Sequence, residues 1–345
     1  MTVVNLGEAD RTPVDFAANP ATLARLYSEL GCASHRQLLE RLGADIVDLR
    51  GVVDPVWRGP MPKERIRADG VKENFWGWRT KMMPTATGPE ESYCDFALDK
   101  CENVEQLAAH KWPNPDWFDF SDFATRLDEW QGLAVMASGA SVWQHPSFLR
   151  GLDNLLVDMV AEPEMAAFIL DKFTDFYVAY FDRMLSAASG RIDILRIADD
   201  LGMQDRLLIS PAIFAQYVAP RLRRLADMAH SHGAKVMFHS CGAITPLIDG
   251  IIGVGVDILD PIQVTAKDMI PEKLKKEFGS RICLHGAIDT QYLLPHGSPD
   301  EVRRTAREMI RVLGKGGGYI ISPSHVLQTD VPTANILALY EEAQS

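Results

Sequence analysis

The stretch Lys235-Val-Met-Phe-His-Ser-Cys-Gly242 is the part of this chain that most clearly indicates its fold. It begins as an apolar run of β-forming residues and ends in His239 and Cys241, followed by a glycine. Side chains two positions apart in a strand point to the same side, so the imidazole and the thiol lie next to each other. Both groups are ligands for zinc or a similar metal. The stretch therefore predicts a buried strand that ends at a candidate metal site.

Outward from this stretch, short apolar strands alternate with helices from about residue 130 to the end of the chain. Strands that alternate with helices imply right-handed βαβ units and a parallel sheet. The strands expected in this part are residues 133–137, 192–197, 236–238, 257–259, 282–284 and 318–321. The helices expected beside them are residues 149–189 with a break at Pro163, 210–232, 245–252, 271–278, 299–312 and a last one from about 332.

Two further strands are expected nearer the N-terminus, at residues 45–49 and 12–16. Eight parallel strands would close into a (β/α)8 barrel of the TIM type, so the expected fold is α/β with residues 1–345 in a single domain. An open doubly wound sheet is the alternative. No Gly-x-Gly-x-x-Gly follows a first strand, which weighs against a dinucleotide-binding sheet. Residues 54–120 break the rhythm and are expected to form an irregular insertion or flap with an antiparallel element, whose tryptophans could wall the barrel mouth.

Composition narrows the class of protein. The chain has 345 residues, 47% of them hydrophobic, and a formal net charge of -12. Nucleic-acid binding requires clustered Lys and Arg, and the basic residues here are scattered. Five widely spaced cysteines do not suggest a disulfide framework. The N-terminus does not resemble a signal peptide, and no apolar run is long enough to cross a membrane. We therefore expect a cytoplasmic enzyme that acts on a small molecule and binds neither nucleic acid nor membrane.

Polar side chains follow the predicted strands, and in a barrel the ends of the strands meet at one rim. Asp199, Asp200 and Gln204 follow one strand and are the candidate catalytic or substrate-orienting residues. The alternative for the two aspartates is a helix cap. The candidate substrate-binding residues at the same rim are Trp143, Gln263, Asp289 and Gln328.

A catalytic metal site needs a third protein ligand beside His239 and Cys241. His325 is the first choice because it lies just past the end of a strand at the same rim, and Cys283 is the second choice. Asp199 or Asp200 could also contribute a ligand. The alternative without a metal is that Cys241 packs as a buried apolar residue and that His239 is hydrogen-bonded in the core.

Several motifs occur in an order that resembles a known family. They are Asp10-Arg-Thr-Pro-Val-Asp15, Asp199-Asp-Leu-Gly202, Phe238-His-Ser-Cys-Gly242, Gly286-Ala-Ile-Asp-Thr290, Pro323-Ser-His325 and Asp330-Val-Pro332. Together they resemble the uroporphyrinogen decarboxylase-like superfamily, and most of all its bacterial branch of corrinoid-linked methyltransferases and O-demethylases. The resemblance implies a (β/α)8 barrel with zinc bound by a His-x-Cys pair and a later Cys or His. His239 and Cys241 match that pair, and His325 falls at the later position, where Ser324 stands in place of a cysteine found in some relatives.

The resemblance also implies an activity. It points to a zinc-dependent methyltransferase that moves a methyl group between a small substrate, such as an aryl methyl ether, and a corrinoid on a separate carrier protein. The alternative is a cofactor-free decarboxylase of the uroporphyrinogen type, but the chain lacks the arginine-rich N-terminal segment that holds that substrate's carboxylates. A metal-independent lyase and a non-catalytic binding protein are further alternatives. Barrels of this kind are compatible with a homodimer.

Overall fold

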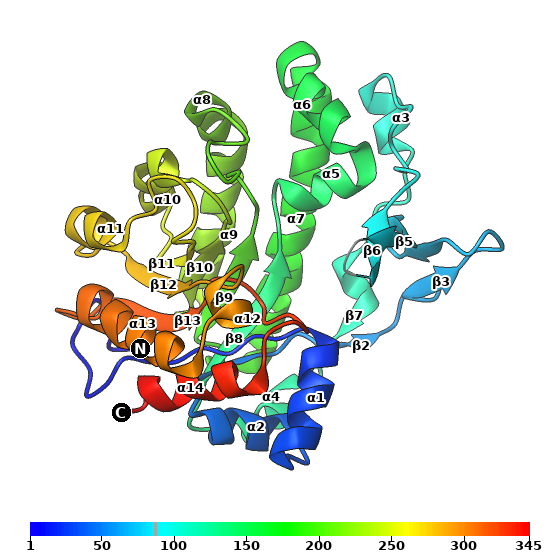
Figure 1. Ribbon diagram of the computed structural model, residues 1–345. Coiled ribbons are helices and arrows are strands. Elements are labelled where there is room, and N and C mark those ends of the chain that lie inside the picture. Colours follow the sequence, from blue (N-terminus) through cyan, green and yellow to red (C-terminus); the bar gives the residue numbers. More distant parts are fainter. Residues whose placement is uncertain (86–87) are drawn as a thin grey trace.

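A curled sheet of seven parallel strands forms the centre of the molecule (Figure 1). The computed structural model describes residues 1–85 and 88–345. The strands lie side by side in the order β1 (Ile46–Asp48), β8 (Ala134–Ala140), β9 (Ile194–Ala198), β10 (Lys235–His239), β11 (Ile258–Ile262), β12 (Cys283–Ile288) and β13 (Tyr319–Pro323). Seven of the predicted strands are confirmed. The curled sheet is consistent with a TIM-type barrel.

The predicted eighth strand is reduced to a bridge between the two edge strands of the sheet. On one side, Ile321 in β13 donates its N–H to Pro13 and accepts one from Asp15, at 2.9 and 3.0 Å. On the other side, Asp45, just before β1, donates to the carbonyl of Val14 at 2.8 Å. Pro13 has no N–H to donate, and the N–H of Val14 is bonded to the side chain of Asp45. The segment therefore joins both edges without forming a longer ladder.

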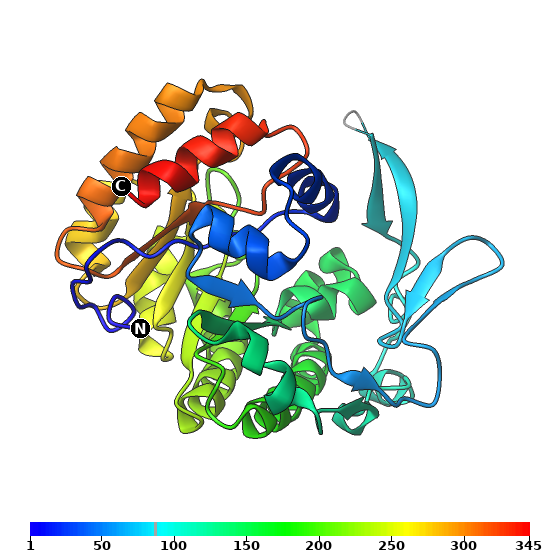
Figure 2. The same cartoon turned by 90° about the horizontal axis from the view of Figure 1, so that it is seen from below.

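Helices cover the outer face of the sheet, as both views of the ribbon show (Figures 1 and 2). The α-helices of the described residues, including α3, which packs on α7 and not on the sheet, are α1 (Pro20–Leu30), α2 (His35–Leu42), α3 (Val104–Ala108), α4 (Phe123–Arg126), α5 (Gln144–Arg150), α6 (Leu152–Ala161), α7 (Pro163–Ala188), α8 (Pro211–Ile213), α9 (Ala219–Ser231), α10 (Ile248–Gly253), α11 (Pro271–Phe278), α12 (Leu293–His296), α13 (Pro299–Leu313) and α14 (Thr333–Ala343). The predicted break at Pro163 is confirmed as the start of α7. The start of α13 is defined by a capping box between Ser298 and Glu301.

The inside of the sheet holds two layers of side chains. The basal layer lies at the beginning of the strands and is apolar: Ile46, Met136, Ile194, Met237, Ile258, Cys283 and Ile320, closed from below by Val3 and Val4. Two residues further along each strand comes a polar layer: Asp48, Ser138, Arg196, His239, Asp260, His285 and Ser322. Because side chains on one face of a strand recur every second residue, both layers point inward. The polar layer thus lies above a closed apolar floor.

An antiparallel arm stands beside the parallel sheet (Figure 2). It consists of the pair β2 (Val56–Trp57) and β7 (Phe118–Asp119) and of a sheet formed by β3 (Glu64–Ile66), β4 (Lys72–Asn74), β5 (Arg79–Thr85) and β6 (Gly88–Tyr93). This agrees with the antiparallel element expected in residues 54–120, although their status as an insertion stays a prediction. The expectation that the tryptophans of this segment wall the barrel mouth needs correction for Trp76. Trp76 stacks on Phe173 of α7 with ring centroids 4.2 Å apart, so it fastens the arm to the helix layer instead of walling the mouth.

Candidate metal centre

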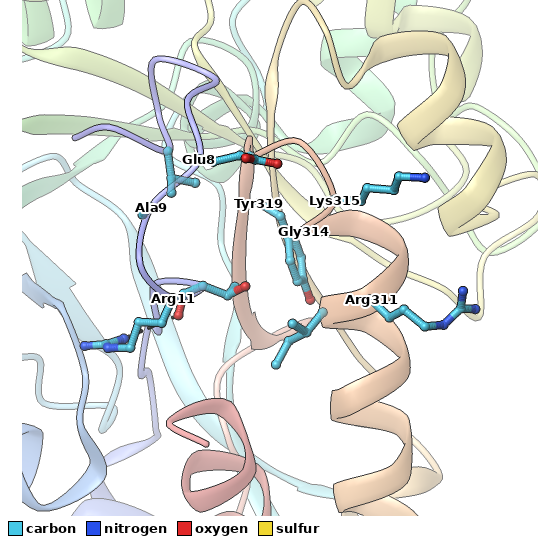
Figure 3. Close-up of a pocket in the computed structure, with 11 residues that line it drawn as sticks. Glu8, Ala9, Arg11, Arg311, Gly314, Lys315 and Tyr319 are labelled. Carbon is cyan, nitrogen blue, oxygen red and sulfur yellow. Dashed lines mark hydrogen bonds between the residues drawn. The ribbon is translucent and has the colours of Figure 1, made fainter.

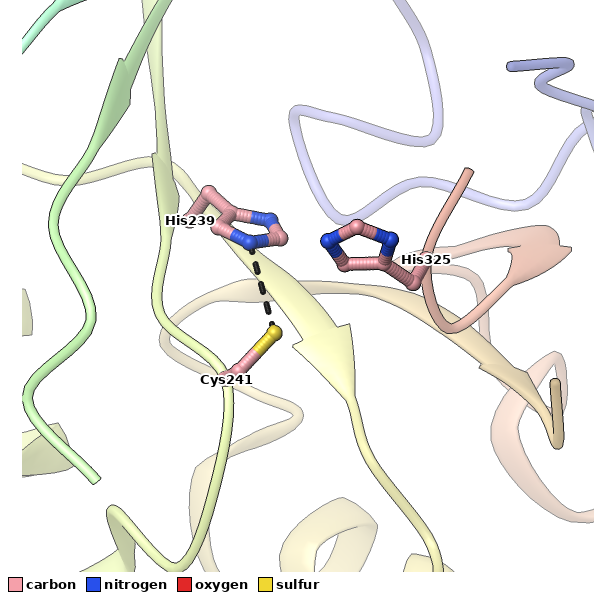
Figure 4. Close-up of side chains that lie close together, drawn as sticks. All are labelled: His239, Cys241 and His325. Carbon is pink, nitrogen blue, oxygen red and sulfur yellow. Dashed lines mark hydrogen bonds between the residues drawn. The ribbon is translucent and has the colours of Figure 1, made fainter. Parts of the chain in front are cut away.

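Three side chains from two strand ends converge at the top of the polar layer, to which His239 itself belongs (Figure 4). His239 is the last residue of β10, Cys241 follows two residues later, and His325 lies two residues beyond β13. One ligand atom from each lies within 4.8 Å of the other two, and the Sγ of Cys241 is 3.4 Å from the Nε2 of His239. Ligands of a tetrahedral zinc ion lie about 3.3–3.8 Å from one another, given Zn–N and Zn–S bonds of about 2.0–2.3 Å. The donor set suits zinc and the spacing of Cys241 and His239 falls in this range, whereas the whole cluster, within 4.8 Å, would have to close slightly around an ion.

A glycine allows the chain to turn directly after Cys241. Gly242 has a φ of +91°, a conformation that side chains with a Cβ rarely adopt, and a Cβ there would lie 2.5 Å from the backbone of Gly202. The loops after β9 and β10 pack against each other at this point. The close approach keeps the Cys241 thiol next to the end of its own strand.

The second nitrogen of His239 faces a buried carboxylate. Its Nδ1 lies 2.9 Å from Oδ2 of Asp260, the residue beside it on β11. Nη2 of Arg196, which can only donate, lies 2.7 Å from the same Nδ1 and 2.8 Å from Oδ2 of Asp260. Metal binding at Nε2 requires the tautomer in which Nδ1 donates to Asp260, and Arg196 then donates to the carboxylate alone. Hydrogen bonds of this type orient metal-binding histidines and raise their basicity.

Asp260 is itself held by a charged network in the polar layer. Arg196 donates from Nε to its Oδ2 at 2.8 Å, and His285 bonds its Oδ1 through Nδ1 at 2.9 Å. The other ring nitrogen of His285 bonds Asp15 at 3.0 Å. Burial alone would raise the pKa of Asp260, but Arg196, His239 and His285 together hold that pKa well below its ordinary value. Asp260 is therefore a carboxylate.

His285 is the cation between two carboxylates. Burial by itself would lower the pKa of His285, but Asp260 and Asp15 outweigh burial and raise that pKa to about 9. The ring is therefore protonated at neutral pH and balances part of the negative charge beneath the metal ligands. Arg196 was not predicted to take part in the site, although its position two residues after the inward-facing Ile194 was an available signal.

The thiol of Cys241 lies in surroundings that disfavour its ionisation. Burial, followed by the carboxylates of Asp200 and Asp260, raises its pKa. A bound metal ion reverses this balance, because a coordinating thiol gives up its proton. Desolvation and the nearby His239 lower the pKa of His325, which favours the neutral imidazole that binds metals.

The paired aspartates have different positions. The carboxylate of Asp199 is fully buried and accepts hydrogen bonds from the hydroxyl of Ser141 and from the backbone N–H groups of residues 142–144. It therefore holds the loop that leads into α5, and burial raises its pKa to about 6. A catalytic role of Asp199 stays a prediction. Asp200 points toward the site: its Oδ1 lies 3.8 Å from Nε2 of His239 and accepts the N–H of Cys241.

A chamber that borders His239 and His325 adjoins a second cavity with an aromatic lining. The chamber, of about 380 Å³, lies inside the barrel and is lined by Asp15, Phe16, Ala17, Asp48, Arg50, Met136, Gln144, Arg196, Ala198, Asp200, His239, Asp260, His285, Ser322, Pro323, His325 and Val326. The aromatic pocket, of about 250 Å³, is lined by Tyr93, Phe96, Trp143, Gln144, Ser147, Phe148, Leu152, Asp200 and Leu208. Both are bordered by Asp200 and Gln144. The arm thus contributes Tyr93 and Phe96 to this pocket, and Trp143 lies in its wall.

The other candidate rim residues lie on the outer side of the cluster. Gln263 accepts the N–H of Gly242 at 2.8 Å and donates to Gln204 at 3.2 Å. Asp289 uses both oxygens to accept backbone N–H groups of residues 291–293, so its carboxylate caps a turn. Gln328 accepts a hydrogen bond from Asn19 at 2.9 Å. The structure therefore places Gln204 with Gln263 and gives Asp289 a structural role.

Cys283, the second choice for the third metal ligand, lies too deep in the sheet to reach the cluster. It lies in the basal layer, two residues before His285, and burial raises its pKa to about 12. Ser324, where some relatives carry cysteine, donates its hydroxyl to the carbonyl of Ile262 at 3.1 Å. His325 is thus the third ligand that the geometry offers.

A cavity at the opposite end of the sheet brings no such groups together (Figure 3). It has a volume of about 370 Å³ and lies between the N-terminal segment and the end of α13. Arg311 and Lys315 point away from it, and Arg11 is paired with Asp45. The chemistry of the molecule is therefore concentrated at the carboxyl ends of the strands.

Comparisons with known proteins identify the family of the chain. The model of the uroporphyrinogen decarboxylase (URO-D) family matches residues 124–345. A methylated-thiol–coenzyme M methyltransferase of Methanosarcina mazei is 30% identical over 163 residues, which are 47% of this chain and 41% of that protein. A uroporphyrinogen decarboxylase of Coxiella burnetii is 23% identical over 199 residues, 53% of this chain and 48% of that protein. The matches thus span half or less of these relatives' length.

The fold has a counterpart among solved structures. A methyltransferase from Methanosarcina mazei superimposes with a TM-score of 0.71 at 17% sequence identity, over 99% of this chain and 96% of that one. At this identity the likeness concerns the fold. Within the described residues, every helix is too short or too polar to span a membrane.

Proposed function

Because the chain belongs to the uroporphyrinogen decarboxylase family, we propose that it is a zinc-dependent methyltransferase. It moves a methyl group between a small substrate, such as an aryl methyl ether, and a corrinoid on a separate carrier protein. The observation that carries the proposal is the cluster of His239, Cys241 and His325 beside the chamber. Two imidazoles and one thiolate with an open position form the kind of donor set that catalytic zinc uses. The relative with 30% identity is a methyltransferase.

The bound zinc would supply a Lewis acid for the ether oxygen. A corrinoid in the cobalt(I) state, held by the carrier protein, would supply the electron pair for the methyl carbon, and the phenolate would leave with the electron pair of the carbon–oxygen bond. The residues of the chain hold the reactants in place: the aromatic pocket takes the ring of the substrate, and Asp200 lies between that pocket and His239. Asp260 keeps the Nε2 of His239 directed at the metal position.

The aromatic pocket supports an aryl ether as the methyl donor. Tyr93 and Phe148 stack with ring centroids 3.8 Å apart, and Phe96, Trp143, Leu152 and Leu208 complete an apolar wall. A single substituted ring fills a space of this size, and apolar walls with a few polar groups are typical of small-molecule sites. The polar groups here, Asp200 and Gln144, lie on the side of the pocket that borders the chamber.

The decarboxylase alternative is not favoured by the charges of the chamber. Four carboxylates line it, those of Asp15, Asp48, Asp200 and Asp260. Three cations line it as well, Arg50, Arg196 and the protonated His285, but Arg196 and His285 are both bonded to Asp260. A porphyrinogen with many carboxylates would therefore meet repulsion that few free cations offset.

Removal and return of zinc tests the proposal. The purified protein should contain one equivalent of zinc by elemental analysis and should form methylcobalamin from 2-methoxyphenol and cob(I)alamin, followed by absorbance. A chelator should abolish the reaction, and zinc, but not magnesium, should restore it, because magnesium prefers oxygen ligands. A protein that binds no zinc, or that decarboxylates uroporphyrinogen at the same rate with and without chelator, would contradict the proposal.

A further inference from the structure

The aromatic pocket contains a single charged side chain. Among the described residues that line it, Asp200 is the only acid and none is lysine, arginine or histidine. Tyr93 is the other ionisable residue of the lining, and burial raises its pKa to about 12, so its hydroxyl stays uncharged at neutral pH. The rest of the lining is aromatic or aliphatic except for the amide of Gln144 and the hydroxyl of Ser147. A ligand in this pocket therefore meets one negative charge and no positive one.

The carboxylate of Asp200 is not paired with a lysine or an arginine. Its Oδ1 accepts the N–H of Cys241 at 2.9 Å, and its Oδ2 accepts a hydrogen bond from the amide of Gln144 at 3.3 Å. Among the described residues, the only ionisable nitrogen within 4.0 Å of this carboxylate is Nε2 of His239, at 3.8 Å. None of the three candidate metal ligands lines the pocket, so the charge of a bound metal would lie beyond Asp200 as seen from the pocket.

Among the described residues, cations line the chamber and not the aromatic pocket. Arg196 and His285 are already bonded to Asp260, and Arg50 lies 3.9 Å from Asp48. An anionic group on a ring in the aromatic pocket therefore finds no cation there. A carboxylate that leaves water without a cation loses hydration that nothing replaces, and the charge of Asp200 adds repulsion.

A neutral donor group on the same ring meets the opposite situation. An ionised carboxylate has about four acceptor positions on its two oxygens, and Asp200 uses two of them for Cys241 and Gln144. A hydroxyl or a primary amide on the ring can donate to the remaining positions, and hydrogen bonds to a charged acceptor are stronger than those between neutral groups. The pocket thus favours a ring that is uncharged and carries a donor.

We propose that Asp200 makes the aromatic pocket select by charge: it binds aryl methyl ethers whose ring is uncharged and carries a hydrogen-bond donor, and it rejects methoxybenzoates. The inference rests on the proposed function, since it takes an aryl methyl ether as the methyl donor. A volume of about 250 Å³ admits a substituted ring of either kind, so charge and not size separates the two classes. Asp200 is then a specificity-determining residue for the methyl donor.

Two probes of nearly equal shape, 3-methoxybenzamide and 3-methoxybenzoate, separate charge from size. At neutral pH the first is uncharged and the second is an anion. We expect the zinc-loaded wild-type protein to bind the benzoate about 10-fold more weakly, with both dissociation constants measured by isothermal titration calorimetry. Asp200→Asn removes the charge and keeps the shape, so the ratio of the two constants should fall to about 3 or less.

The matched control for this change is Asp153→Asn. Asp153 is an exposed carboxylate in the first turn of α6 and lines neither cavity. The ratio of the two dissociation constants should stay at the wild-type value, because solvent and salt screen an exposed charge.

A second variant adds the missing cation. Leu152 lines the pocket and is 38% exposed at the start of α6, so a lysine there can hold its ammonium group in water at the edge of the pocket. Leu152→Lys should strengthen binding of the benzoate about 10-fold relative to the uncharged variant Leu152→Gln, with little change for the benzamide.

Equal dissociation constants for the two probes in the wild-type protein would overturn the inference. A ratio that neither Asp200→Asn nor Leu152→Lys changes would also overturn it, and so would a wild-type protein that binds neither probe. The proposed function is decided separately: if both probes transfer their methyl group to cob(I)alamin equally well, the methyltransferase stands and only the selection by charge is wrong. A protein that binds the probes with the expected ratio but transfers no methyl group would keep the selectivity of the pocket and contradict the proposed function.

Discussion

The basal layer and the polar layer lie on the same seven strands, one pleat apart, and yet have opposite chemistry. The basal layer contains four isoleucines, two methionines and a cysteine, packed with Val3 and Val4. The polar layer above it contains two carboxylates, an arginine, two histidines and two serines. The apolar floor excludes water from below, and charge pairs in the polar layer are therefore strong. On each strand, the residue that stabilises the apolar floor and the residue that belongs to the polar site are therefore only two positions apart.

Substitution of two cysteines tests the difference between the layers most directly, because Cys241 is a candidate metal ligand and Cys283 lies in the basal layer. Cys241→Ala should abolish zinc binding and reduce methyl transfer to background, since two imidazoles alone hold zinc poorly. Cys283→Ala should keep its zinc and its rate. Elemental analysis and the rate of methylcobalamin formation measure both effects. Loss of zinc from Cys283→Ala but not from Cys241→Ala would reverse the assignment of the two layers.

Asp260 tests the charge network of the polar layer. Asp260→Asn leaves Arg196 and His285 without their shared carboxylate, and breaking a buried pair costs about 3–5 kcal/mol of the free energy of unfolding. Zinc affinity should fall about 10–100-fold, as expected for loss of the partner that orients a ligand histidine. Denaturant unfolding and chelator competition measure these quantities.

The control for this change is Ser322→Ala in the same layer. It lies outside the charge network and should cost no more than about 1.5 kcal/mol, with zinc affinity unchanged. If both variants lose stability equally, the layer acts through packing and not through charge.

The protonation of His285 should be visible in the pH dependence of stability. Its pKa is about 9 in the folded protein and about 6.5 in an unfolded chain. The stability that its charge contributes is therefore complete below about pH 6.5 and is lost as the pH rises through 9, on the order of 3 kcal/mol in all. The difference in free energy of unfolding between wild type and His285→Gln should shrink over this range. A constant difference would show that the ring is neutral throughout.

The smallest effect is expected for a conservative change in the basal layer. Ile258→Val removes one methylene two residues before Asp260 and should cost about 0.5–1.5 kcal/mol, because it leaves a small cavity. Zinc content and methyl transfer should stay at the wild-type level. A change in zinc affinity would show that the floor positions the ligands, which the separation of the layers does not predict.

Much of the fold could be predicted from local sequence. The runs at β9, β10 and β12 are short, apolar and bounded by turn residues, which is the pattern of a strand buried on both faces. The two ends of the helical stretch after β9 followed from Pro211 and Gly233 in the same way. The eighth strand was less predictable, because its hydrogen bonds depend on the distant residues Ile321 and Asp45.

The sequence by itself determined that an imidazole and a thiol lie at the end of β10, because their spacing of two residues is a local property of any strand. Only the tertiary structure decided which distant groups join them. His325 comes close because β13 ends at the same rim, Asp199 is withdrawn because a loop surrounds it with donors, and His285 becomes a cation because the fold places it between Asp15 and Asp260. These pairings join residues far apart in the chain, and burial gives them their strength.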